Sequence, residues 1–197
     1  MSQGAHPVER QRRLHPAELD EAQAQLYRTI TEGPRSAGPR LFELTDEHGA
    51  LNGPFGGFLL SPAVGDALQA LGAAVRFRAT LSDRVREMAI LSVAARWASA
   101  FEAHAHEAIG RASGLTDSEI ERLAAGELPE LDDPAEVAAL RVVRALLDGD
   151  VDDATWAACV PPLTSSTVFE LTTLVGYYST LALQMRTFRV DDAPARP

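Results

Sequence analysis

Glu87, Glu102 and His106 are the residues of this chain whose types and spacing best fit proton-transfer chemistry. Glu102 and His106 are four residues apart, so in a helix they stand on the same face. Glu87 shares its helical stripe with Ile90 and Leu91, which are typical core residues. A carboxylate on an apolar stripe costs free energy unless it is paired or used. A partly buried histidine beside carboxylates is suited to general acid–base catalysis near neutral pH.

Purely structural interpretations of the same residues stay open at this point. Glu102 and His106 can form an ordinary ion pair on a solvated helix face, worth a few tenths of a kcal/mol. Glu87 can pair with Arg84 or Arg86 near the start of a helix, where the helix dipole also favours a carboxylate. Under these interpretations the three residues have no catalytic role.

Other kinds of site are less well supported. A metal site would need Glu102, His106 and a third ligand such as His48, but the chain has no HExxH sequence. His104 lies about 200° around a helix from Glu102 and His106, so we expect it at the surface or at a subunit contact. Cys159 is the only cysteine and is interpreted as a small buried residue. The sequence also lacks a GxSxG elbow and a dinucleotide fingerprint in a strand-to-helix context.

Composition narrows the class of protein. The 197 residues fit one domain, and 46% of them are hydrophobic, which is ordinary for a globular protein. All 18 basic residues are arginine, which excludes a lysine Schiff base and a P-loop lysine. The net charge of -10 argues against nucleic-acid and anionic-membrane surfaces. The sequence resembles neither a signal peptide nor a membrane span, so we expect a cytoplasmic protein.

Helical periodicity and capping signals run along nearly the whole chain, and no segment has the alternation of a strand. The predicted fold class is therefore all-α. Residues 33–61 are rich in glycine and proline and form a long connection of the kind that is often functional. The expected helices cover residues 17–31 after Pro16, 62–78 after Ser61, 83–97, 100–112, 117–126 after Thr116, 134–147 after Asp133, a short stretch with Trp156 that Asp152 or Asp153 caps, and 167–188 with a capping box at Thr167 and Glu170.

Four segments together resemble the carboxymuconolactone decarboxylase family, which also contains the alkyl hydroperoxidase D-like proteins. The resemblance covers roughly residues 60–188, and the loop at Asn52 is similar to the decarboxylase-like branch. The segments that carry it are Arg86–Arg96, Phe101–His106, Gly114–Ile120 and Val175–Ala182.

The resemblance implies an alkyl hydroperoxidase D-like helical bundle that assembles into a homotrimer or homohexamer. In the peroxidase branch a CxxC pair precedes the histidine, and a glutamate on the previous helix completes a proton relay. These positions fall here on Ser99, Glu102, His106 and Glu87, so the thiols of peroxidase chemistry are missing. The remaining carboxylates and histidine resemble the decarboxylase arrangement, which needs no cofactor.

The expected function is decarboxylase-type lyase chemistry on a small carboxylated lactone or related acidic metabolite. His106 is expected to transfer the proton, and Glu87 and Glu102 to orient it and set its pKa. The expected substrate-binding residues are Arg84, Arg86, Asn52 and Tyr177.

Two alternatives remain: a helical oligomer that binds a small ligand without catalysis, and a metal-dependent enzyme of the same fold. Residues 1–60 are expected to form an N-terminal helix and a Gly/Pro-rich loop that pack on a core of residues 61–190. Residues 191–197 are expected to be a disordered tail.

Overall fold

The computed structural model describes residues 10–33, 43–160 and 162–190, so the predicted tail at 191–197 lies outside the described residues. Over the described ranges the fold is all-helical, as predicted, with one isolated antiparallel bridge between Thr45 and Leu51 and no strand. The elements are a 3₁₀ turn at Pro16–Glu18, α1 (Glu21–Glu32), α2 (Pro54–Phe58), α3 (Pro62–Phe77), α4 (Asp83–Trp97), α5 (Ala100–Ala112), α6 (Asp117–Ala124), α7 (Pro134–Asp148), α8 (Asp153–Cys159) and α9 (Ser165–Phe188).

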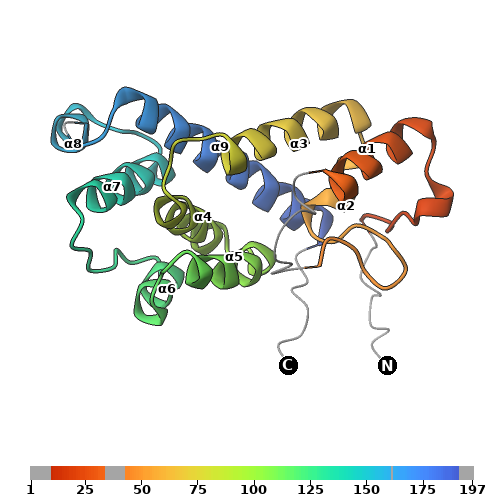
Figure 1. Ribbon diagram of the computed structural model, residues 1–197, viewed down its shortest axis with the longest axis horizontal. Helices are drawn as coiled ribbons and strands as arrows, with labels where there is room; N and C mark the ends of the chain where they lie inside the picture. Colours follow the sequence, from red (N-terminus) through yellow and green to blue (C-terminus); the bar gives the residue numbers. More distant parts are fainter. Residues whose placement is uncertain (1–9, 34–42, 161, 191–197) are drawn as a thin grey trace, which may run out of the picture.

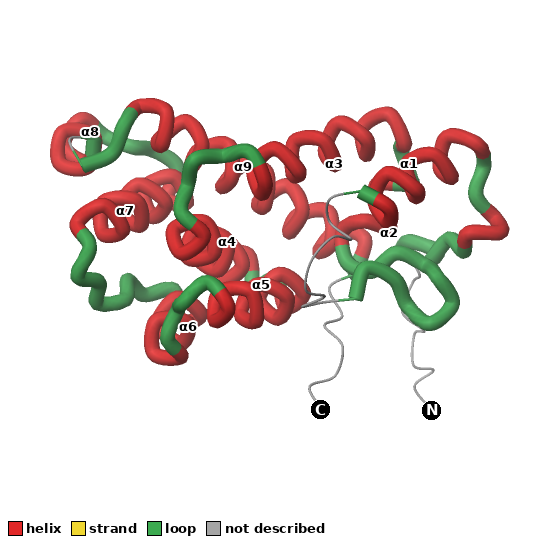
Figure 2. The backbone as a smooth tube through the Cα atoms, viewed as in Figure 1, coloured by secondary structure: helices red, strands yellow, loops and turns green. Residues whose placement is uncertain are grey.

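The long helix α9 connects the two halves of the molecule. Figure 1 shows α4 to α8 gathered around one end of α9 and α1 to α3 around the other, and Figure 2 shows that loops join the helices on all sides. One face of α9 is buried along its whole length because apolar residues recur every three or four positions. These residues are Leu171, Leu174, Tyr178, Leu181 and Met185.

Helix α4 is the centre of the core. It packs against α5, α6, α7 and α9, so it is buried on nearly every side. Met88, Ile90 and Val93 point in different directions around α4, and each has at most 1% of its surface exposed. A helix that is apolar all round is typical of such a central position. Glu87 lies on this helix, and the structure must therefore compensate its charge internally.

A tight joint between α4 and α5 sets the direction of the second helix. Ala98 ends α4 in the left-handed conformation, with φ 51° and ψ 44°, and Ser99 follows as the N-cap of α5. Positive φ is uncommon for a residue with a Cβ, and here it turns the chain back within two residues. The helix α5 then lies along α4, which brings its buried side toward Glu87.

Two side-chain contacts tie α4 to its other neighbours. Arg84 pairs with Glu119 of α6 at 2.7 Å and with Glu136 of α7 at 2.8 Å, so it links three helices. At the other end of α4, Trp97 Nε1 donates a hydrogen bond of 3.0 Å to Ser179 Oγ of α9. The position of α4 is thus fixed at both ends.

Most of the predicted helix boundaries are confirmed. Three features differ: the start of α1, the short helix α2 and the start of α9. Pro16 begins a 3₁₀ turn, and α1 begins only at Glu21, because the Asp20 side chain accepts a hydrogen bond from the Gln23 amide. The Gly/Pro-rich connection contains the short helix α2, whereas the sequence predicts a loop there. Among the described helices, none is long and apolar enough to span a membrane.

The predicted capping box at Thr167 and Glu170 is wrong. Helix α9 begins two residues earlier, because the Thr164 hydroxyl accepts a hydrogen bond of 3.1 Å from the Thr167 amide. Glu170 instead accepts hydrogen bonds from the amide and the hydroxyl of Thr80 in the connection between α3 and α4. Glu170 therefore links α9 to the connection between α3 and α4.

Candidate functional site

The structure brings Glu87, Glu102 and His106 together between α4 and α5. His106 Nδ1 lies 2.6 Å from Glu87 Oε2, and His106 Nε2 lies 3.3 Å from Glu102 Oε2. All three side chains are at most 5% exposed. Glu102 and His106 share a face of α5 as their spacing predicts. The surface ion pair considered above is thereby excluded, because neither partner is solvated.

Opposite effects act on the proton of His106. Burial alone would lower the pKa of this imidazole, but the charges and hydrogen bonds of Glu87 and Glu102 outweigh burial and raise the pKa to about 9. The pKa of Glu87 would be raised by burial, yet His106, Arg86 and Arg76 together hold it below its ordinary value. At neutral pH the site therefore holds an imidazolium between acidic groups.

The ring of Tyr178 contacts the ring of the histidine. Its ring meets the His106 ring edge to face at 5.3 Å between centroids, and Tyr177 packs in the same way on Tyr178 at 5.2 Å. Burial and the nearby carboxylates raise the pKa of Tyr178 well above its ordinary value, so its phenol stays protonated. Tyr177, the predicted substrate-binding residue, is buried beside Tyr178, and its role in binding stays a prediction. Tyr178 closes the side of the site that α9 forms.

Two arginines lie near Glu87. Arg86 Nε is 3.3 Å from Glu87 Oε1, and its terminal nitrogen is 2.5 Å from Asp83. Arg76 of α3 also lowers the pKa of Glu87 through its charge. Sequence analysis did not single out Arg76, because its proximity to Glu87 depends on tertiary contacts between distant segments. Arg86 and Arg76 offset part of the negative charge of the site.

The remaining predicted binding residues have other roles in the structure. Arg84, expected to hold a substrate carboxylate, already pairs with two carboxylates of the protein, so its donors are occupied. Asn52 donates to the Glu43 carbonyl and accepts a hydrogen bond from Arg13, which fixes the loop before α2. Both residues therefore have partners within the protein, and their predicted role in substrate binding stays a prediction.

His104 and His48 lie outside this cluster. His104 is exposed on α5, as its helical position predicts. His48 lies 3.4 Å from Glu47 and packs against the ring of His15. Within the described ranges no three His, Cys, Asp or Glu side chains are arranged to hold a metal ion. The metal set of His48, Glu102 and His106 is thus not assembled.

The arrangement can hold and move a proton. A buried imidazolium that contacts carboxylates through both nitrogens can donate a proton from either nitrogen. The two contacts differ in length. The contact at Nδ1 is short and fixes the ring, whereas the contact at Nε2 is longer. Proton exchange with a bound molecule is therefore easier on the Nε2 side, beside Glu102.

Comparison with known proteins is consistent with this cluster. Residues 62–145 match the model of the carboxymuconolactone decarboxylase family, so the resemblance found in the sequence is confirmed over this segment. The matched segment runs from the start of α3 into α7 and includes Glu87, Glu102 and His106, whereas Tyr178 lies beyond it. A search of curated proteins found no match.

Proposed function

We propose that this chain is a decarboxylase-type lyase that acts without a cofactor on a small carboxylated lactone or a related acidic metabolite. The observation that carries the proposal is the buried His106 ring held between Glu87 and Glu102 inside the family-matched segment. A charged cluster of this kind costs desolvation free energy, and such clusters concentrate at functional sites.

The residues argue against the thiol chemistry found elsewhere in the superfamily. Ser99 and Glu102 occupy the positions of the two cysteines that the resemblance implies, and Cys159 is buried on α8. A thiol peroxidase needs a reactive thiolate that is accessible to its substrate. The chain therefore retains the proton-transfer part of the arrangement without the redox part.

In the proposed reaction, the bond between the lactone and its carboxylate carbon breaks and CO₂ leaves. The electron pair passes into the unsaturated lactone as a dienolate, and a proton is then added to carbon. His106 supplies this proton from Nε2, next to Glu102, while Glu87 fixes the ring through Nδ1. Arg86 acts as a positioning residue for Glu87. General acid–base assistance of this kind accelerates a reaction by about 10²–10⁴-fold.

We further propose that residues 61–190 form an alkyl hydroperoxidase D-like bundle that assembles into a trimer or hexamer, with residues 1–60 packing on it. In support, α1 and α2 both lie against α3. The N-terminal part is longer than the family pattern requires, so we propose that it shapes the substrate pocket.

The test is CO₂ release from carboxymuconolactone and a panel of small carboxylated lactones. His106→Gln should lower the rate by about 10²-fold or more, since it removes the titrating group but keeps an amide between the carboxylates. His104→Gln, an exposed histidine two residues away, is the matched control and should keep the natural rate.

Two outcomes would overturn the proposal. The first is turnover by His106→Gln within tenfold of the natural protein. The second is no turnover of any lactone by the natural protein, together with a retained metabolite in its native mass spectrum, which would favour the non-catalytic ligand-binding oligomer.

A further inference from the structure

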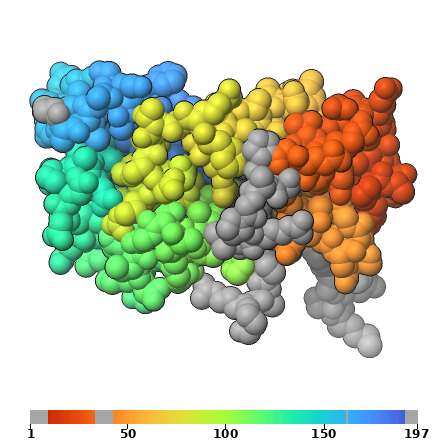
Figure 3. All heavy atoms as spheres, viewed as in Figure 1, coloured from red at the N-terminus to blue at the C-terminus, as the bar shows by residue number. Residues whose placement is uncertain are grey.

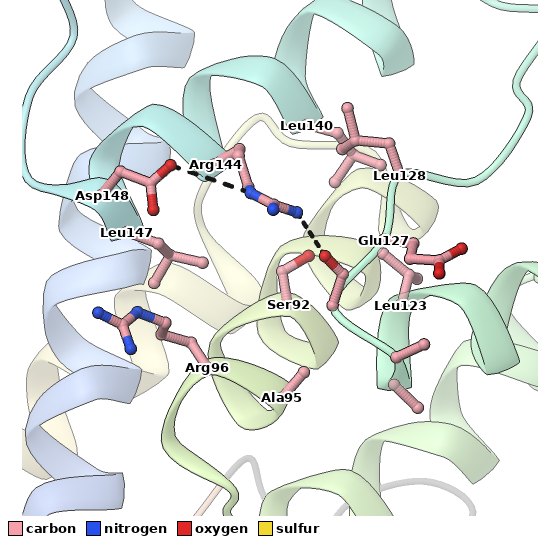
Figure 4. A pocket seen from close by; sticks show the side chains of 13 residues that line it. Ser92, Ala95, Arg96, Leu123, Glu127, Leu128, Leu140, Arg144, Leu147 and Asp148 are labelled. Atoms are coloured by element: carbon pink, nitrogen blue, oxygen red, sulfur yellow. Dashed lines mark hydrogen bonds and ion pairs between the residues drawn. The ribbon is translucent and has the colours of Figure 1, made fainter.

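We propose that a cavity between α4, α6 and α7 binds a small monocarboxylate with an apolar body. The cavity has a volume of about 190 Å³ and is drawn in Figure 4. This is smaller than the roughly 300–1,000 Å³ of pockets for drug-sized ligands, so it fits a short aliphatic or single-ring compound.

The cavity is separate from the His106 site. Its walls include Ser92, Ala95 and Arg96 of α4. Arg96 is nine residues after Glu87, which places it on the opposite side of this helix, about 180° away. A molecule bound here would therefore lie behind the helix that carries Glu87, and it would not contact the imidazole.

The inner walls of the cavity are apolar. Leu123 and Leu140 form buried surfaces, and Leu147 lines one side (Figure 4). Leu128 also lines the cavity, although 41% of its surface is exposed. An apolar ligand body would cover this leucine and remove its exposed surface from water, which is favourable by about 25 cal/mol per Å².

Two arginines and two carboxylates line the cavity, and among the described residues each of them except Arg96 has an ion-pair partner. Asp148 faces Arg144 at 3.9 Å, and Glu127 lies 3.4 Å from Arg122. Arg144 also donates to the Gly126 carbonyl, so it bridges α7 and the end of α6 across the cavity (Figure 4).

Arg96 is the lining arginine that has no carboxylate partner among the described residues. It lies at the edge of the cavity beside Leu147 (Figure 4), and among the described residues its guanidinium contacts the ring of Trp97, 5.9 Å from the centroid. A planar guanidinium with unused donors binds a carboxylate in bidentate fashion. One free guanidinium beside apolar walls therefore selects an acid with one carboxylate.

Benzoate is the probe, with benzyl alcohol as its neutral counterpart, titrated calorimetrically into the full-length protein. Arg96→Gln should weaken benzoate binding about tenfold and leave benzyl alcohol unchanged, because only the charged contact is lost. Arg141→Gln is the matched control: it removes an exposed arginine from α7 that does not line the cavity, and it should change the dissociation constant less than twofold. Ala95→Leu fills the cavity and should abolish binding of both probes.

Three outcomes would overturn this proposal. Benzoate binding that is equally strong in Arg96→Gln would show that the arginine does not select the acid. Loss of benzoate binding in His106→Gln would place the ligand in the other site. Absence of benzoate binding, combined with a change of assembly mass in Ala95→Leu, would show that a second copy of the chain fills the cavity.

Discussion

Glu87 and Glu102 stabilise the charged form of His106, and this compensates the hydration that the imidazole loses on burial. An isolated buried imidazole is neutral at pH 7, because desolvation disfavours its charged form. Here Glu87 and Glu102 reverse that preference and keep the ring charged. The three groups therefore depend on one another, and removing His106 leaves two buried acidic side chains without their shared partner.

This coupling predicts a pH dependence of stability. The raised pKa of His106, about 9 against an ordinary 6.5, stabilises the fold fully below about pH 6.5, and this contribution is lost as the pH rises through 9. The lowered pKa of Glu87 contributes fully above about pH 4.5 and is lost as the pH falls below that value. Thermal unfolding should therefore show its highest midpoint between pH 4.5 and 6.5, and a fall of several degrees toward pH 9.5.

The His106→Gln variant is the control for this profile. It should be less stable near pH 6 and should show a much flatter slope between pH 6.5 and 9.5. Equal slopes in the two proteins would show that His106 titrates normally.

A second prediction concerns the rate. Glu102→Gln removes the carboxylate on the Nε2 side, so the pKa of His106 should fall. Because the proposed acid is the imidazolium, the alkaline limb of the pH–rate profile should move to lower pH by about one to three units. A profile that keeps its alkaline limit would mean that Glu102 does not act on the histidine.

Residue types predicted the centre of this site better than its surroundings. The spacing of Glu102 and His106 fixes their relation within one helix, so it is readable from the sequence. The choice between Tyr177 and Tyr178 depends on how α9 is rotated against α5. Tyr177 and Tyr178 both lie on the buried side of α9, so helical periodicity does not decide between them.

At the scale of helices, capping chemistry explains which boundaries were predictable. Ser82, Thr116 and Asp133 each accept a hydrogen bond from an amide of the following helix, and their helices begin where expected. Thr164 does the same for α9, but Thr167 offered an equally good motif nearby. Competing caps on one segment are resolved by tertiary contacts, here the hydrogen bonds of Glu170 to Thr80.

Arg84 carries the prediction for this scale. Arg84→Ala should lower the free energy of unfolding by about 2 kcal/mol, because it leaves Glu119 and Glu136 without their shared partner. Arg111→Ala is the control: its pair with Asp117 is largely exposed and should contribute less than about 1 kcal/mol. Equal losses in urea denaturation would contradict the linking role of Arg84.

At the scale of the whole molecule, α9 exposes large apolar side chains at its surface. Phe169 is 72% exposed and Leu183 is 44% exposed, although both lie on the longest helix. In the space-filling view, the α8 and α9 region (blue) forms the upper left of the visible face (Figure 3). Exposed large apolar side chains of this kind are often covered by another protein surface.

We expect the protein to assemble through this surface. Light scattering should give a mass well above the 21.2 kDa of one chain, and Phe169→Glu should lower that mass. Trp156→Glu, which alters a large aromatic residue of α8 that is 43% exposed, serves as the control and should leave the assembly intact. A natural protein that elutes as a monomer would contradict the proposed trimer or hexamer.

The hydrogen bond from Trp97 to Ser179 makes the fluorescence of Trp97 a probe of the local structure. Ser179 directly follows Tyr178, so the indole reports on the turn of α9 that covers the imidazole. In a Trp156→Phe background, the fluorescence of Trp97 would shift to longer wavelength whenever this turn moves away from α4 and water reaches the indole. The kinetics of access to the buried histidine can then be followed by stopped-flow emission, with no label attached.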